Sequence, residues 1–503
     1  MAPDPAARGT PPARLRVAVV GSGPAGLYTA EAVIKQAGAA GITAAVDVLD
    51  RLPTPYGLVR YGVAPDHPSI RGIADYLRRV LEHPSVRFLG DVCFGREVTR
   101  GMLLAGYDAV VYATGAPADR RLRVPGEELP GSTAAAEFVR WYCGHPDADP
   151  AAFTLDAEAV AVIGAGNVAL DVARVLAAPP AAFRATDVPE PVLAALLASR
   201  VREVHVIIRR GPAEARFTPR ELRELGEVPG IEVTVDPGAA GLDPDGVRAP
   251  DGLPDGVRSP DGVPVADGPV PDGVPVADRR VRQNLAVLRE WAARPAPPRP
   301  SAARRVHLRF GWRPVAVLGT DRVTGLRIER TRPPRPGEDA HGPVGTGEFA
   351  ELPVQLVLRS IGYRGVPLPG VPFDAVRGVV PHHEGRVLGP DGRPLPGEYV
   401  AGWLKRGPTG VIGSNKSDAA ETVRSLLADL AGRPRGAGPT PAQEPGPPAA
   451  GLPERLAAAG VHPVSYREWL AIDAAEHDLA AALGRGERVK LRDWDALHQA
   501  CGH

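Results

Sequence analysis

Residues 17–27 read VAVVGSGPAGL, and this stretch determines how the first part of the chain folds. An apolar run rich in β-branched residues ends at Val20 and meets three glycines in the spacing G-x-G-x-x-G. Gly21 allows a tight turn, Gly23 lets a pyrophosphate approach the backbone, and Gly26 lets the following helix pack closely on the strand. The pattern therefore predicts a strand, a turn and a helix whose first amides face a phosphate group.

A second apolar run, 45–49, ends in the acidic residue Asp50. A carboxylate at the end of this strand can bind the ribose hydroxyls of a dinucleotide, and it would repel a ribose 2′-phosphate. We therefore expect the first glycine-rich turn to bind FAD rather than NADPH.

The same pattern returns in residues 160–170, which read VAVIGAGNVAL. Gly164 and Gly166 take the first two glycine positions, and Ala169 takes the third, which this fingerprint tolerates. The context is again an apolar run followed by a helical pattern. The sequence therefore predicts a second dinucleotide-binding turn.

The apolar run after the second turn, 204–208, ends in two basic residues, Arg209 and Arg210. Guanidinium groups at this point suit a ribose 2′-phosphate, which they can bind through charge-assisted hydrogen bonds. We therefore expect NADPH at the second site. A simple dehydrogenase needs one dinucleotide, so two such sites indicate electron transfer between two dinucleotide cofactors.

The length of 503 residues suggests two or three domains, and 59 basic residues balance 59 acidic ones, so net charge gives no attraction to nucleic acid. No apolar run is long enough to span a membrane, and we expect a cytoplasmic protein.

The three cysteines, Cys93, Cys143 and Cys501, include no C-x-x-C pair. Their spacing argues against a dithiol relay, an iron–sulfur cluster or a structural metal site, so redox chemistry would come from an organic cofactor or a partner.

Two segments have a composition unlike the rest. Residues 236–280 repeat Pro-Asp-Gly-Val with small variations, which favours a loose surface insertion over a packed core. Another Pro- and Gly-rich stretch, 431–453, is typical of a linker. Beyond it, 454–503 has a mostly helical pattern, and we expect Trp469 and Trp494 to anchor it against the main body.

Four longer segments carry a family resemblance. They read PTPYGLVRYGVAPDHP at 53–68, GNVALDVARVL at 166–176, RRGPAEARFTPRELREL at 209–225 and AGWLKRGPTGVI at 401–412. Together they resemble the adrenodoxin-reductase type of ferredoxin–NADP(+) reductase over nearly the whole chain. Thioredoxin reductases need a dithiol that this chain lacks, and the related small subunit of glutamate synthase carries a Cys-rich cluster domain.

The resemblance implies an α/β architecture of two Rossmann-like, doubly wound dinucleotide-binding domains, with the NADPH domain inserted into a discontinuous FAD domain. The expected boundaries are 14–116 and 351–435 for the FAD domain, 117–350 for the NADPH domain, and 436–503 for the linker and the helical extension.

Carried over position by position, the resemblance implies cofactor contacts in addition to the glycines of the two turns. Those with FAD are Ala25, Asp50, Leu58, Phe94, Trp403, Gly410, Val411 and Ile412. Those with NADPH are Ala165, Gly166, Asn167, Val168, Arg209, Arg210, Glu221 and Gly410. His67 and Glu224 match polar residues near the flavin and the nicotinamide, and they are the candidate catalytic residues. Pro219 suits a first helical turn, so we expect it to begin the helix that presents Glu221.

The resemblance further implies that NADPH gives a hydride to FAD and that single electrons then pass to a ferredoxin-type iron–sulfur protein. Residues 199–225 hold seven Arg and four Glu, so we expect a basic face there, extended by Lys405 and Arg406, that attracts an acidic ferredoxin. Two alternatives stay open. One is an NADPH diaphorase with a quinone, flavodoxin or small-molecule acceptor, and the other is a flavin electron-transfer subunit of a larger complex.

Overall fold

The computed structural model describes residues 15–67, 71–236, 276–294, 304–335, 338, 342–431, 451–486 and 488–503. The Pro-Asp-Gly repeats and most of the expected linker lie outside the described residues. Helix α9 (Val276–Ala292) begins inside the insertion that we expected at 236–280, so the predicted end of the insertion was too late. The physical reason is that α9 places Leu285, Leu288 and Trp291 in the hydrophobic core.

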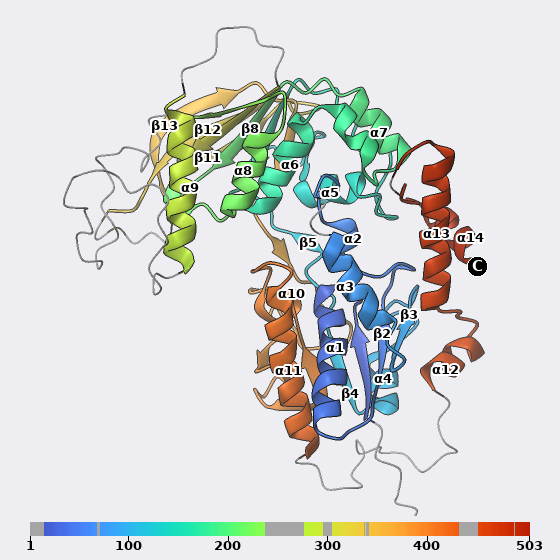
Figure 1. Cartoon of the computed structure of the whole chain (residues 1–503). Coiled ribbons are helices and arrows are strands. Elements are labelled where there is room, and N and C mark those ends of the chain that lie inside the picture. Colours follow the sequence, from blue (N-terminus) through green and yellow to red (C-terminus); the bar gives the residue numbers. More distant parts are fainter. Residues whose placement is uncertain are drawn as a thin grey trace, which may run out of the picture.

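The first sheet, whose strands β2, β3 and β4 are labelled in the lower half of Figure 1, has seven strands in the order β16-β17-β18-β4-β1-β2-β3. The strands are β1 (Leu15–Val20), β2 (Ala44–Leu49), β3 (Val86–Leu89), β4 (Ala109–Tyr112), β16 (His382–His383), β17 (Arg386–Leu388) and β18 (Pro394–Val400). From β18 to β3 all neighbours are parallel, while β16 and β17 are antiparallel. Both faces are covered: Val17 and Val19 pack beneath α1 (Pro24–Ala39) and α11 (Ser414–Ala431), and Ala18 and Val20 pack on the opposite face.

The second sheet has six strands in the order β6-β14-β7-β8-β10-β9, and every neighbouring pair is parallel. The strands are β6 (Ser132–Ala134), β7 (Ala159–Ile163), β8 (Glu203–Ile208), β9 (Ile231–Val235), β10 (Arg304–Phe310) and β14 (Leu356–Arg359). Helices α5 (Ala135–Tyr142), α6 (Asn167–Ala177), α8 (Pro219–Glu227) and α9 cover one face. An antiparallel sheet of β11 (Trp312–Leu318), β12 (Gly325–Arg332) and β13 (Val344–Leu352) packs on the other.

Two parallel sheets with helices against them confirm the predicted fold of two Rossmann-like units. The chain passes between them twice, and the crossing segments β5 (Ala118–Asp119) and β15 (Tyr363–Arg364) pair with each other. One predicted boundary was wrong. We expected the first domain to resume at residue 351, but β14 belongs to the second sheet and pairs with β7, so the return comes after Arg359. The run 356–359 is buried and apolar, a pattern that suits either sheet.

The C-terminal part of the chain folds into α12 (Leu452–Ala458), α13 (Tyr466–Ala482) and α14 (Trp494–Cys501), which confirms the helical pattern. Trp469 is 2% exposed and lies in the core of the first sheet. Trp494 is partly exposed, and its Nε1 donates a hydrogen bond to Asp147 at 3.0 Å. Both tryptophans therefore anchor the extension as predicted.

The remaining helices are short. They are α2 (Leu58–Tyr61), α3 (Arg71–Leu81), α4 (Arg100–Gly106), α7 (Glu190–Leu197) and α10 (Trp403–Arg406). In the part of the chain that the structure describes, no helix has the length and apolar character needed to cross a membrane. The cytoplasmic location expected from the sequence stays a prediction.

Candidate functional site

The residues expected to hold FAD follow the carboxyl ends of parallel strands in the first sheet. Gly21 follows β1, Asp50 follows β2, Phe94 lies in the loop after β3, and Trp403 follows β18. The carboxyl ends of parallel strands lie along one edge, and nucleotides bind at this edge in open α/β sheets. The structure therefore gathers residues from four distant segments at the edge where a nucleotide site is expected.

The first glycine-rich turn is too tightly packed for side chains at two of its glycines. A Cβ at Gly21 would lie 2.5 Å from the carbonyl oxygen of Ala113, and a Cβ at Gly26 would overlap the carbonyl oxygen of Gly21. Gly21 also has a φ of +111°, a backbone conformation that favours glycine. At Gly23 the space is open apart from Gly57, whose Cα would be 3.8 Å from an added Cβ. Gly21 and Gly26 are therefore required by the tight turn and the close packing of the helix, as predicted, while the contact of Gly23 with a pyrophosphate stays a prediction.

The N-terminus of α1 fits a phosphate group. Of the described residues, none caps its first amides with a side chain, and its first turn contains no acidic residue. Thr114 lies beside Gly21, and its hydroxyl is buried without a hydrogen-bond partner in the described structure. Asp50 is held next to the turn, because its carboxylate accepts hydrogen bonds from the amides of Ser22 (2.8 Å) and Leu52 (3.0 Å). Uncapped amides, an unpartnered hydroxyl and a fixed carboxylate together fit the phosphates and ribose of FAD.

Apolar and aromatic groups lie exposed along the same edge. The Trp403 indole is half-buried and stacks on the Tyr363 ring with 5.5 Å between the centroids, so Trp403 is not simply a core residue. Leu58 is 43% exposed and Val411 is 59% exposed. Exposed large apolar side chains close to a nucleotide-binding edge are typical of a surface that a ligand covers.

Other residues expected to contact FAD also pack against neighbouring residues of the chain. Phe94 packs edge-on against Tyr112 with 5.6 Å between the ring centroids, so its ring is already engaged inside the domain. Ala25 packs against Gly402, where an added Cβ would overlap the Ala25 methyl group. Gly410 is exposed and has a φ of +83°, which makes glycine necessary in the turn that leads through Ile412 into α11.

The second glycine-rich turn has the same construction between β7 and α6. A Cβ at Gly164 would overlap a backbone carbonyl oxygen, whereas a Cβ at Gly166 would meet nothing within 4 Å, so Gly166 leaves room for a ligand. Within the described ranges, no side chain caps the first amides of α6. The Asn167 side chain instead accepts a hydrogen bond from the Thr218 amide at 2.9 Å and so fixes the start of α8. That helix begins at Pro219, as predicted.

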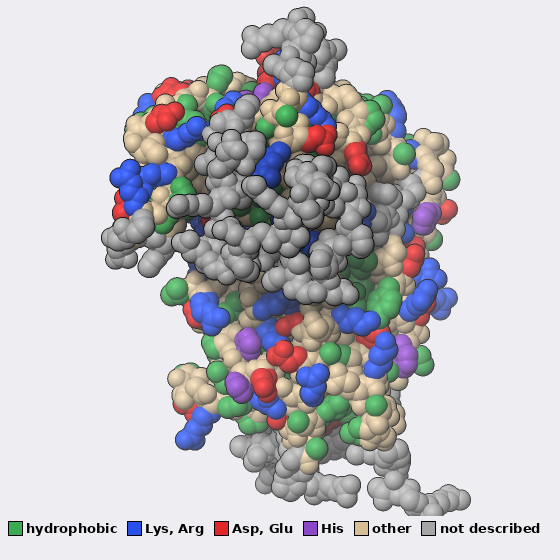
Figure 2. Space-filling view, turned by 60° about the vertical axis from the view of Figure 1, so that its left-hand side comes forward, with side chains coloured by type: hydrophobic (Ala, Val, Ile, Leu, Met, Phe, Trp, Pro, Cys, Tyr) green, Lys and Arg blue, Asp and Glu red, His purple; other side chains and the backbone are tan. Residues whose placement is uncertain are grey.

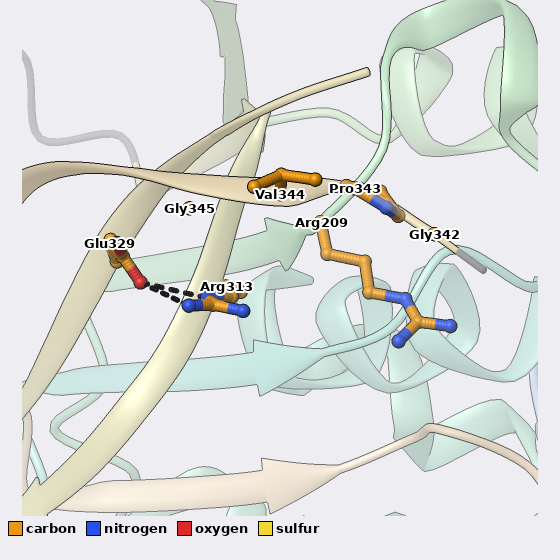
Figure 3. A pocket seen from close by; sticks show the side chains of 7 residues that line it. All are labelled: Arg209, Arg313, Glu329, Gly342, Pro343, Val344 and Gly345. Atoms are coloured by element: carbon orange, nitrogen blue, oxygen red, sulfur yellow. Dashed lines mark hydrogen bonds and ion pairs between the residues drawn. The ribbon is translucent and has the colours of Figure 1, made fainter. Parts of the chain in front are cut away.

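Arg209 and Arg210 follow the end of β8, where a ribose would lie. Figure 3 shows the Arg209 side chain at a depression whose other lining residues are Arg313, Glu329, Gly342, Pro343, Val344 and Gly345. Arg313 donates two hydrogen bonds of 2.6 and 2.8 Å to Glu329, so this carboxylate is already neutralised. No carboxylate of the described chain forms an ion pair with Arg209, whereas Arg210 lies 3.4 Å from Glu214. Arg209 is therefore the freer of the two cations to bind a 2′-phosphate.

His67 and Glu224, which come from different domains, meet at the boundary between the two sheets. The His67 Nε2 lies 2.9 Å from the Asp171 Oδ1 in α6, and its Nδ1 lies 3.3 Å from the Glu224 Oε2 in α8. The second contact has the distance of an ion pair but not the geometry of a hydrogen bond. Directly before His67, Asp66 accepts two hydrogen bonds from Arg174 of α6, at 2.7 and 2.8 Å. The loop after β2 is thus tied to the helices of the second sheet.

Asp66, Asp171 and Arg174 are site residues that we did not identify from the sequence. All three lie in segments already quoted for the family resemblance, and Asp171 and Arg174 are one helical turn apart. That spacing places both side chains on one face of α6. The sequence could therefore have indicated a charged helix face, but not that this face meets Asp66.

The charges around His67 favour its protonated form. Burial lowers the pKa of His67, but the hydrogen bond to Asp171 and the charges of Asp171 and Glu224 raise it, and the resulting pKa lies above the ordinary value of 6.5. Burial also raises the pKa of Glu221, whose Oε2 is buried without a hydrogen-bond partner in the described residues. A buried carboxyl oxygen without a partner suits a group that a bound ligand would satisfy.

The expected basic face is only partly present. Arg216 and Arg223 are exposed, as expected. Lys405 is 3% exposed and forms ion pairs with Asp418 and Glu421, each at 3.1 Å, so the prediction that it extends this face was wrong. The reason is that α10 packs beneath α11, which buries a lysine whose neighbours in the sequence look like those of a surface residue.

The chain matches known proteins along nearly its whole length. Residues 15–235 match the family described as pyridine nucleotide-disulphide oxidoreductase. The chain is 41% identical over 476 residues to the NADPH-ferredoxin reductase FprA of Mycobacterium tuberculosis, covering 94% of this chain and 96% of that protein. It is 38% identical over 497 residues to the mitochondrial NADPH:adrenodoxin oxidoreductase of Homo sapiens, covering 97% of this chain and 92% of that protein.

A solved structure gives the same result in three dimensions. The structure of Mycobacterium tuberculosis FprA in complex with NADPH aligns with 98% of this chain and 100% of its own, with a TM-score of 0.83 and 38% identity. The two parallel sheets, their two glycine-rich turns and these relatives agree with one another. The chain belongs to the adrenodoxin-reductase type of ferredoxin–NADP(+) reductases.

Proposed function

We propose that this chain is an FAD-dependent NADPH–ferredoxin oxidoreductase, with FAD at the first glycine-rich turn and NADPH at the second. The observation that carries the proposal is the pair of turns at the carboxyl edges of two parallel sheets, joined at the boundary by His67 and Asp66. Two dinucleotide sites in one chain suit electron transfer between two dinucleotides. Relatives named as reductases of ferredoxin and adrenodoxin support an iron–sulfur protein as the acceptor.

The protein's own contribution is to bind and orient. When bound, FAD supplies the chemistry of accepting a hydride and releasing electrons singly. The uncapped amides at the N-termini of α1 and α6 would bind the two pyrophosphates, and the stacked rings of Trp403 and Tyr363 would offer an aromatic surface to a bound cofactor. The exposed side chains of Leu58 and Val411 would help to exclude water from bound FAD. His67 contacts Asp171 and Glu224 of the other domain and so links the two halves of the site.

The cysteines argue against a disulfide substrate, even though the matching family model includes disulfide reductases. All three cysteines are free, and Cys143 and Cys501 are buried. Burial raises the pKa of Cys143 to about 12, so its reactive thiolate form is disfavoured. Electrons therefore pass from the flavin site to an external carrier without a protein dithiol.

The first prediction concerns the choice between NADPH and NADH. Replacing Arg209 and Arg210 by Gln should raise the KM for NADPH by about tenfold or more per arginine, because a hydrogen bond to a charged group contributes about 1.5–3 kcal/mol. The KM for NADH should change little, since NADH has no 2′-phosphate. Steady-state reduction of a small dye with each cofactor measures both values.

Arg200 provides a matched control for this experiment. It lies before the amino end of β8, at the opposite end of the strand, and its side chain is 65% exposed. Arg200→Gln should leave both KM values unchanged. An equal rise in the KM of NADPH and NADH in the Arg209 and Arg210 variants would rule out the 2′-phosphate role.

We propose further that the ferredoxin is acidic and docks on the exposed arginines near α8. Figure 2 shows basic and acidic side chains interspersed over the described part of one face of the molecule, so overall charge gives little guidance to a partner. Within 199–225 arginine outnumbers glutamate by seven to four, whereas the whole chain has equal numbers of basic and acidic residues. Arg216 and Arg223 are exposed there, whereas Arg220 is engaged by Glu224 at 2.8 Å and thereby linked to the His67 cluster.

The second prediction tests this docking face. Changing Arg216 and Arg223 together to Glu should slow ferredoxin reduction at low salt by an order of magnitude, because steering by charge affects the association rate. Reduction of a neutral dye by NADPH should stay unchanged. The parent's rate should fall with salt, as the Debye length shrinks from about 10 Å at 0.1 M to about 3 Å at 1 M. Saturating NADPH isolates the ferredoxin step.

The control variant changes Arg322 and Arg393 to Glu, so that net charge shifts by the same amount. Their side chains are 61% and 86% exposed, and neither lies in 199–225. This variant should reduce ferredoxin at the parent's rate. If the Arg216 and Arg223 variant matched the control, the docking face would lie elsewhere. If ferredoxin were not reduced by any variant, a quinone, flavodoxin or small-molecule acceptor would be favoured.

The third prediction follows from the raised pKa of His67. A histidine whose folded pKa is raised contributes stability below its unfolded pKa, near 6.5, and loses it as pH rises through the folded value. The melting temperature of the parent should therefore exceed that of His67→Gln most at pH below 6.5, by a few degrees, since such an ion pair contributes up to about 1 kcal/mol. The difference should shrink at higher pH.

His383→Gln is the control for the pH series. His383 is exposed and lies on β16, the edge strand of the first sheet. Its melting temperature should follow that of the parent at every pH. A His67→Gln difference that stayed constant or grew with pH would show that His67 is not held in its protonated form.

A further inference from the structure

A short segment between β2 and α3, residues 56–62, presses against the first glycine-rich turn; it includes the one-turn helix α2 and is called loop 56–62 below. A Cβ at Gly57 would lie 2.9 Å from the Cα of Gly23, and the Tyr56 amide donates a hydrogen bond to the Ser22 carbonyl at 3.1 Å. Leu58, which follows Gly57 directly, is 43% exposed. The position of loop 56–62 therefore affects both the turn and the surface beside it.

The back of this loop is held by one arginine that is fully inside the protein. The Arg60 side chain is 4% exposed and that of Glu476 in α13 is 0% exposed. The Arg60 Nη1 donates to the Glu476 Oε2 at 3.1 Å, and its Nη2 donates to the other carboxylate oxygen. The guanidinium also lies between two aromatic rings, 5.0 Å from the centroid of Tyr61 and 4.9 Å from that of Trp469. The two hydrogen bonds therefore fix the distance between Arg60 and Glu476, and the two rings restrict the orientation of the guanidinium plane.

The C-terminal segment supplies most of these contacts, although it lies more than 400 residues further along the chain. Besides Glu476 and Trp469, it provides Lys490, whose Nζ donates to the Arg60 carbonyl at 2.9 Å and forms an ion pair with Asp187 at 3.0 Å. The Leu491 amide donates to the Glu476 carboxylate at 2.9 Å. Figure 1 shows α13 running beside both halves of the molecule. The segment therefore connects loop 56–62 to the second sheet's domain.

A buried ion pair of this kind is a poor source of stability. Removing two charges from water offsets most of the attraction between them, and apolar residues of similar volume often stabilise a core as well or better. What a bidentate guanidinium–carboxylate pair adds is a defined geometry. The pair is thus better suited to fix the position of the loop than to hold the C-terminal segment in place.

We propose that Arg60 and Glu476 form a positioning pair through which the C-terminal segment holds loop 56–62 against the FAD-binding turn, so that the segment determines how firmly FAD is retained. The inference rests on the proposed function, because it takes the first turn as the FAD site. Neither residue touches the cofactor in this account; both act through the backbone of the loop. The expected consequence is a change in FAD release without a matching loss of fold stability.

The first variant is Arg60→Lys, studied as the holoenzyme. Lysine keeps a positive charge opposite Glu476 but loses the two-point fork, so FAD should leave about tenfold faster on dilution, as for loss of one charged hydrogen bond. The rise in flavin fluorescence measures release, and the visible circular dichroism of bound flavin reports its surroundings and should change. The melting temperature should stay close to that of the parent. Arg467→Lys, an exposed change in α13, is the matched control and should alter nothing.

The second variant, Arg60→Met with Glu476→Leu, removes both charges and leaves no buried charge without a partner. Its melting temperature should equal or exceed that of the parent, while FAD release stays faster. FAD release at the parent's rate in either variant would overturn the proposal. So would faster release that only accompanied a lower melting temperature in both, because the pair would then be merely structural. A parent protein that contained no FAD would instead contradict the proposed function.

Discussion

A hydride passes only between atoms held about 3–3.5 Å apart, and this constraint explains why the boundary between the two sheets is built from buried charges. Each sheet offers a nucleotide edge at the carboxyl ends of its strands, so the two edges have to be kept in a fixed relation. The Arg174 side chain is 3% exposed and donates two hydrogen bonds of 2.7 and 2.8 Å to Asp66 across that boundary. Its other contact is Asp171, at 2.9 Å, which also binds His67. Paired, directional contacts of this kind set orientation as well as distance.

Other contacts between the two domains also help to keep the two nucleotide edges in a fixed relation. The two crossing segments, β5 and β15, pair with each other, and β15 carries the Tyr363 ring that stacks on Trp403. On another side, Arg485 in the C-terminal segment donates to the Val188 carbonyl at 2.9 Å and pairs with Glu190 at 2.6 Å. The same segment reaches the first sheet through its bridge between Val464 and Gly90. The C-terminal helices are therefore part of the domain arrangement rather than an appendage.

Local features of the site could be predicted from the sequence, and features that depend on distant partners could not. The glycine-rich turns, the acid after β2 and the arginines after β8 follow from local patterns, in which Asp50 lies 29 positions after Gly21 and Arg209 lies 45 positions after Gly164. The pairs Asp66–Arg174 and Arg60–Glu476 join residues 108 and 416 positions apart, and no local pattern relates them. Lys405 was misjudged for the same reason, because its burial comes from α11 packing over it. The boundary at 351 failed because the buried strand β14 fits either sheet equally well.

The sharpest test of the proposed electron transfer is to count electrons in a single mixing experiment. The oxidised holoenzyme, without oxygen, is mixed with a known amount of NADPH and an excess of an acidic one-electron ferredoxin. We expect that flavin absorbance falls first, that ferredoxin is then reduced, and that twice as many ferredoxin molecules are reduced as NADPH molecules are consumed. Flavin reduction that leaves the ferredoxin oxidised while a quinone or dye accepts the electrons would contradict it. So would NADPH consumption without any change in flavin absorbance.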